Sequence, residues 1–157
     1  MRIFLVSLLL VLLAISSRAE VPDHLGSKDA FNLWTGCKPV GLVASLEKHE
    51  TEIDLTEDEI EIATRSRLRS ARLYAEELTF PFLLVSVHVV GNAFSVDVAL
   101  LKPLVDRVFS GREWGGITWA TGSTGTHGTN SNYILSSVSK YIDEFLDDYL
   151  RVNADSC

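Results

Sequence analysis

The sequence predicts an α+β fold, a two-layer sandwich in which a four-stranded mixed sheet carries two helices on one face. Three observations support this. Apolar and polar residues alternate with a period of two from Phe80 to Leu101, which is typical of strands. Helical periodicity appears before this region and again near the end of the chain. The resulting order, β-α-β-β-β-α, lets one-faced strands and amphipathic helices bury each other in two layers.

The first strand is expected from about Val40 to Leu46. In the helix that follows, Thr56 is a natural N-cap, and Glu59 three residues later completes a capping box. The first turn of this helix is acidic and its later turns are basic, as the helix dipole prefers. Apolar residues recur at helical spacing as far as Ala75, so we expect the helix to reach that residue.

The next two strands are expected to form a hairpin around Gly91-Asn92, a dipeptide that suits a two-residue turn. A loop of even length pairs apolar residues with apolar residues across the two strands. This register places Ser86 opposite Asp97 and His88 opposite Ser95, on the face that points away from the core. We therefore expect a polar face that is open to solvent or to a partner.

After a break from about Pro103 to Trp114, a fourth strand is expected from about Gly116 to Thr121. A glycine-rich loop over residues 122–132 then leads into a helix over about 132–152. The expected apolar face of this helix consists of Ile134, Leu135, Val138, Tyr141, Ile142, Phe145, Leu146 and Tyr149.

The beginning of the chain has the layout of a secretory signal peptide. Arg2 precedes an apolar run over residues 3–15, and the small residues Ser17 and Ala19 follow. We expect residues 1–19 to be removed, which leaves a single exported domain over residues 20–157, periplasmic or secreted. The apolar run is shorter than the about 20 residues that a membrane-spanning helix needs, so no membrane span is expected after cleavage.

The net charge argues against one class of partner, and the two cysteines raise the question of a disulfide. The chain has a net charge of −7. Such an acidic chain is unsuited to nucleic acid, since phosphate binding needs clustered Lys and Arg. Cys37 and Cys157 would both reach an oxidising compartment. The sequence leaves two alternatives open, a disulfide between them or two free cysteines.

The glycine-rich segment is the first candidate binding surface. A glycine-rich turn before a helix is suited to an anion, but this one lacks the lysine of a P-loop and the glycine spacing of a dinucleotide site. We expect a mobile polar loop that docks a protein backbone or a small anion, and in which His127→Ala leaves stability almost unchanged. Its candidate ligand or partner residues are Gly122, Thr124, Gly125, Thr126, His127, Gly128 and Asn130.

The open face of the hairpin is the second candidate surface, formed by Ser86, His88, Ser95 and Asp97. Ser86, His88 and Asp97 are the residue types of a hydrolase triad. However, two residues on one strand face lie about 6 to 7 Å apart, too far for direct proton transfer. The four histidines show no spacing typical of a metal site. We therefore predict no catalytic residue, no metal and no cofactor.

Two resemblances bear on function. The segments SRLRSARLY and YIDEFLDDYLRVN resemble a group of uncharacterised exported bacterial proteins. The order of elements resembles accessory domains of the bacterial cell envelope, such as the amino-terminal domain of the Tol-Pal propeller protein and the lipoprotein activators of penicillin-binding proteins. These resemblances imply a non-enzymatic exported accessory protein with a protein partner in the envelope. The alternative is a small hydrolase or anion-binding enzyme that uses His127 or His88 with the loop 122–132.

Overall fold

The computed structural model describes residues 26–157 apart from 106–107, 109–110 and 112. The predicted signal peptide, residues 1–19, lies outside the described residues. The elements follow the predicted order, with one short helix added before the first strand. They are α1 (Ser27–Leu33), β1 (Gly41–His49), α2 (Glu57–Ser70), β2 (Phe82–Val90), β3 (Ala93–Val105), β4 (Glu113–Thr126) and α3 (Ser131–Asn153).

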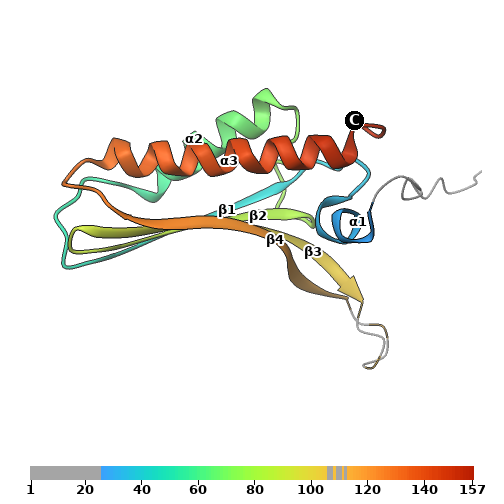
Figure 1. Ribbon diagram of the computed structural model, residues 1–157, viewed down its shortest axis with the longest axis horizontal. Coiled ribbons are helices and arrows are strands. Elements are labelled where there is room, and N and C mark those ends of the chain that lie inside the picture. The colour runs from blue at the N-terminus through green and yellow to red at the C-terminus, as the bar shows by residue number, and fades with distance from the viewer. Residues whose placement is uncertain (1–25, 106–107, 109–110, 112) are drawn as a thin grey trace, which may run out of the picture.

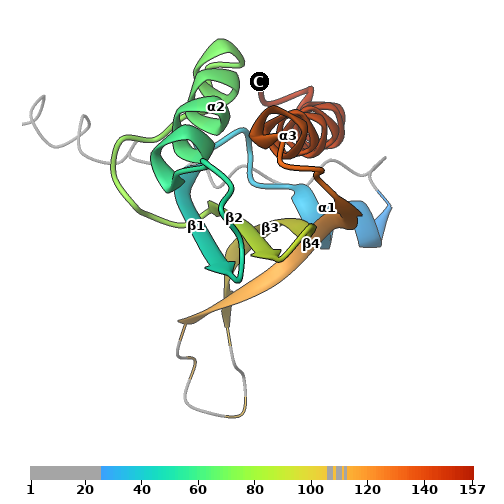
Figure 2. The same cartoon turned by 90° about the vertical axis from the view of Figure 1, so that its left-hand side faces the viewer.

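The four strands form one mixed sheet in the order β1-β2-β3-β4. β1 pairs with β2 in parallel, and α2 is the crossover between them, whereas β2, β3 and β4 pair antiparallel. Figure 2 shows α2 and α3 side by side on one face of this sheet. The predicted α+β fold with two helices on one face of a four-stranded mixed sheet is confirmed.

The core lies between this helical layer and the sheet. Alternate residues of β2 and β3 are buried against the helices, from Leu83 to Val89 and from Phe94 to Leu100. On α3, the ring of Phe145 is fully buried, 5.4 Å from the ring of Trp119. Among the described residues, no helix combines the length and the apolar composition needed to cross a bilayer.

The start of α2 follows the prediction, but its end does not. The N-cap Thr56 accepts a hydrogen bond from the Glu59 amide and donates its own amide to the Glu59 carboxylate, so the capping box is confirmed. The helix ends at Ser70, not at Ala75, because Arg72 has a φ of 60°. Residues 73–75 then pair with Val40, the residue before β1, in an isolated parallel bridge.

The hairpin of β3 and β4 extends beyond the rest of the sheet. The break predicted from about Pro103 to Trp114 is too long, because β3 runs through Pro103 to Val105 and β4 begins at Glu113. Pro103 fits there because β2 pairs no further than Leu101, so no donor is needed on that side. Thr118 is an extra residue opposite the Leu100/Leu101 step. Such a bulge bends the hairpin, and Figure 1 shows its far end turning away from α3.

The two cysteines form a disulfide, Cys37–Cys157, with an S–S distance of 2.02 Å. The alternative of two free cysteines is therefore wrong. The bridge closes a loop with a sequence separation of 120 residues, which stabilises the folded chain by about 4 to 5 kcal/mol in the chain-entropy model. It joins the segment after α1 to the last residue of the chain.

Asn153, at the end of α3, joins the same two segments without a covalent bond. Its side chain is only 1% exposed. Its Oδ1 accepts hydrogen bonds from the backbone amides of Thr35 (2.9 Å) and Cys37 (3.2 Å), and its Nδ2 donates to the carbonyl of Leu33 (3.1 Å). The neighbouring Tyr149 hydroxyl also bonds the side chain of Thr35. The segment after α1 is thereby fixed to the C-terminal helix.

Candidate functional site

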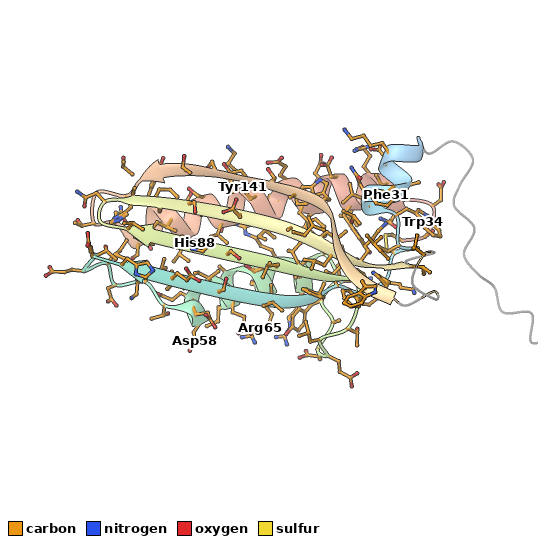
Figure 3. The ribbon with its side chains drawn as sticks, turned by 90° about the horizontal axis from the view of Figure 1, so that it is seen from below. Phe31, Trp34, Asp58, Arg65, His88 and Tyr141 are labelled. Atoms are coloured by element: carbon orange, nitrogen blue, oxygen red, sulfur yellow. A yellow bond between two sulfur atoms is a disulfide. The ribbon has the colours of Figure 1, made fainter. Side chains whose placement is uncertain are left out.

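The face of the sheet opposite α2 and α3 is not covered by any of the described elements. Figure 3 views this face directly, with β1 to β4 lying side by side and His88 on it. Residues that pair across neighbouring strands lie on the same face, so the registers of the three strand pairs define its composition. We call it the open face, and it divides into a polar half and an apolar half.

The polar half contains the second candidate surface. The predicted register is confirmed, because Ser86 pairs with Asp97 and His88 with Ser95. No hydrogen bond joins the side chains of Ser86, His88 and Asp97 to one another in the described structure. The residue types of a triad are present, but their proton-transfer geometry is absent.

The side chains of Ser86 and His88 instead bond to residues of β1. Ser45 Oγ donates to Ser86 Oγ at 3.1 Å, and His88 Nδ1 lies 3.1 Å from a carboxylate oxygen of Glu47. Neither partner was predicted from the sequence. Their pairing depends on the register between two parallel strands that are separated by a helix, and no local pattern specifies that register.

The apolar half lies next to it, toward the bent end of the β3–β4 hairpin. A hollow of about 400 Å³ lies at its border with the polar half. Leu84, Ala99, Ile117 and Ala120 supply its apolar lining, and Ser86 and Asp97 line it on the side of the polar half. The side chain of Ile117 is 60% exposed. The expectation of a polar open face is therefore correct for only half of it. The apolar half was missed because Ile117 comes from a strand whose bulge shifts the register by one residue.

The first part of the glycine-rich segment is a strand. β4 continues to Thr126, so the loop predicted over residues 122–132 begins only after that residue. Gly122 and Gly125 are needed for close packing, because a Cβ on Gly122 would lie 2.4 Å from the Val96 carbonyl oxygen and one on Gly125 would lie 2.9 Å from the Phe94 ring. Strand packing therefore requires glycine at both positions, and their part in binding a ligand stays a prediction.

Part of this segment belongs to the open face. Thr124 pairs with Ser95 and Thr126 pairs with Ala93, and both threonines lie on the edge strand of the sheet. The structure thus brings residues of the two candidate surfaces together. Asn130 has a different role, since its side chain caps α3 by accepting a hydrogen bond from the Asn132 amide at 3.0 Å.

His127 is buried, with 5% of its surface exposed, and does not lie in a mobile loop. Its Nδ1 accepts a hydrogen bond from the Thr129 amide, and its Nε2 therefore carries the proton that it donates to the Gly91 carbonyl, both at 3.0 Å. The His127 amide also donates to the carbonyl of Asn92. The residue fastens the turn after β4 to the turn of the β2–β3 hairpin. Both ring nitrogens are occupied by backbone groups, so neither faces a nucleophile.

This end of the molecule is acidic. A hollow of about 480 Å³ beside His127 is lined by Glu50 and Glu52, among others. Glu47 and Asp97 lie on the neighbouring polar half of the open face. The open face thus runs from an acidic end near the hairpin turn to an apolar end near α1.

Comparison with known proteins gives distant similarities. No family model matches the chain, and no curated protein matches it at a significant level. A dodecamer of a PelC variant from Paraburkholderia phytofirmans is 14% identical with a TM-score of 0.45, covering 73% of this chain and 91% of that chain. A candidate lipoprotein from Caulobacter crescentus CB15 is 13% identical with a TM-score of 0.24, covering 71% of this chain and 86% of that chain. Neither similarity is close enough to assign a role, and neither structure is a Tol-Pal domain or a penicillin-binding-protein activator, so those resemblances stay predictions.

Proposed function

We propose that the chain is a non-enzymatic, exported accessory protein of the bacterial cell envelope that binds a partner protein on its open face. The observation that carries this proposal is an uncovered sheet face with a hollow apolar half. A sheet face normally packs against another layer, as the opposite face of this sheet packs against α2 and α3. An apolar patch on an exposed surface is typical of a protein interaction site.

The partner that fits this face is an amphipathic helix with basic residues at one end. A helix is the kind of element that covers the other face of the sheet. Its apolar side chains would fill the hollow lined by Leu84 and Ile117. Its Lys or Arg side chains would lie over Asp97 and Glu47. The attraction between these opposite charges would speed the association of the two proteins and orient the helix on the face. Export is supported by the signal-like segment at residues 1–19 and by the disulfide, a bond that persists in oxidising compartments.

The proposal is tested by site-specific photo-crosslinking in the producing cell. A probe at Ile117 reports on the open face, and a probe at Ile62 on α2 is the matched control, because the two side chains are 60% and 56% exposed. We expect a discrete protein adduct at Ile117 and none at Ile62. Mass spectrometry of the adduct should place the crosslink in a helical segment that ends in basic residues.

A charge reversal then tests how the partner is recognised. Asp97→Lys should abolish the Ile117 adduct, whereas Asp147→Lys, at an exposed position on α3, should leave it unchanged. Equal adducts at Ile117 and Ile62 would show nonspecific capture and overturn the proposal. An adduct with a second copy of this chain would show that the open face mediates self-association and does not bind a different protein.

A further inference from the structure

A second cavity lies at the other end of the molecule, between α1 and the neck of the β3–β4 hairpin. It has a volume of about 310 Å³, which falls at the lower end of the range for small-molecule sites. Trp34, Phe80, Pro81 and Pro103 form apolar walls, and Lys38 and Lys102 contribute two ammonium groups. Figure 3 places Trp34 at this end of the sheet, beside α1. We call this cavity the α1 pocket.

Lys102 is the unusual residue of the α1 pocket. Its side chain is half-buried, and its Nζ donates to the carbonyls of Trp34 (3.1 Å) and Ala30 (3.4 Å). These bonds leave one ammonium proton for another acceptor. Within the described part of the chain, no carboxylate lies within ion-pair distance of Lys102 or of Lys38. Burial lowers the pKa of Lys102, because the charged ammonium has lost water without gaining an anion.

Trp34 adds a second unsatisfied group. Its Nε1 is buried and has no hydrogen-bond partner in the described structure. Buried donors normally find an acceptor, and leaving one without a partner is unfavourable. Because the atom is closed to water, a ligand in the α1 pocket reaches it only if the indole ring shifts.

The floor of the α1 pocket is held in place before any ligand arrives. Thr35 lines the pocket, and its amide bonds to Asn153, while the disulfide of Cys37 anchors the chain two residues further on. A preformed site binds more tightly, because little ordering is needed when the ligand enters.

We propose that the α1 pocket binds a small carboxylate with an apolar body. The carboxylate lies between the ammonium groups of Lys102 and Lys38, and the hydrocarbon packs against Trp34 and Phe80. A monoanion is favoured over a phosphate dianion, because most of the lining is apolar and the pocket offers few donors. In a chain with a net charge of −7, two ammonium groups at one apolar pocket form a local positive site that attracts such an anion.

The test uses octanoate as the probe, with octanamide and octylamine as analogues of equal chain length. Isothermal titration should give a Kd of about 1 mM or tighter for octanoate. Octanamide should bind at least about ten-fold more weakly, since it cannot make a charge-assisted hydrogen bond, and octylamine should not bind. In NMR spectra, octanoate should shift the indole N–H signal of Trp34 and leave that of Trp114 in place. Equal binding of octanamide, or a site elsewhere on the chain, would overturn the proposal.

Three lysine variants locate the anion. Lys102→Met should weaken octanoate binding about ten-fold or more, and Lys38→Met, at an exposed position that does not support the fold, should weaken it less. Lys140→Met on α3 is the control and should bind as the unmodified chain does. If Lys102→Met does not fold, the octanoate affinity of Lys38→Met alone tests the proposal. An affinity of Lys38→Met equal to that of the unmodified chain would then refute it. This outcome is independent of the crosslinking at Ile117.

Discussion

Replacing Asn153 tests whether a buried amide holds α1 and the following segment on the C-terminal helix. Asn153→Ala removes the acceptor that bonds the amides of Thr35 and Cys37 and the donor that bonds the carbonyl of Leu33. Each such bond contributes about 1 kcal/mol net, and the three groups left behind lie in a region that water reaches poorly. We therefore expect Asn153→Ala to lower the free energy of unfolding by about 2 to 4 kcal/mol.

The assay is equilibrium denaturation with the disulfide intact, so that the bridge contributes equally to all variants. Asn132→Ala, at an exposed site in the first turn of α3, is the control and should change stability by less than about 0.5 kcal/mol. Asn153→Asp is the stricter variant. It keeps an acceptor for the two amides but turns an oxygen toward the carbonyls of Leu33 and Tyr149. It should therefore also destabilise the fold.

A loss below about 0.5 kcal/mol in Asn153→Ala would refute the reasoning, because it would mean that these hydrogen bonds add nothing beyond the disulfide. A neutral Asn153→Asp with a destabilised Asn153→Ala would show that only the acceptor matters. The donor bond to Leu33 would then have no measurable role.

Three further predictions concern stability. Phe145→Ala should lower the unfolding free energy by about 3 to 5 kcal/mol, and a loss below about 1 kcal/mol would contradict its place in the core. His127→Ala should cost about 1 to 3 kcal/mol in the same denaturation assay, where an unchanged midpoint would support a mobile loop instead. Burial raises the pKa of Tyr149, so its contribution to stability is present below pH 10.0 and is lost as the pH rises through its folded pKa. In a phenolate absorbance titration, Tyr149→Phe should remove the last tyrosine to ionise; an unchanged curve would contradict this.

The fold class could be predicted because period and capping are local properties. The alternation in β2 and β3 and the capping box at Thr56 each depend on residues only a few positions apart. The end of α2 could not be predicted in the same way. The apolar spacing continues past Arg72, but the chain turns there in a Schellman motif, in which the Leu73 amide donates to the Leu68 carbonyl and the Arg72 amide donates to the Arg69 carbonyl. The usual sign of such a helix end is a glycine at the residue with positive φ, and this sequence has an arginine there.

The candidate site was harder to predict because it is assembled from four strands. The sequence correctly placed Ser86 opposite Asp97, since a two-residue turn sets that register. It did not show that Ile117 joins Leu84 across β3, because this depends on the bulge at Thr118. His127 was expected to be mobile for a related reason, although it is buried in the turn after β4. Glycines suggested flexibility, whereas Gly125 is there because the ring of Phe94 leaves no room for a side chain.

The disulfide also has a mechanical consequence. A tensile force applied between the beginning of α1 and the C-terminus would pass along the chain to Cys37 and then directly through the bridge to Cys157. The covalent path therefore bypasses the sheet, which lies between the two cysteines in the sequence, while the hydrogen bonds of Asn153 and the ion pair of Arg151 with Asp29 pass part of the load to the end of α3. The open face would therefore keep its shape under tension between these two points, because the load enters α1, the segment after it and the end of α3.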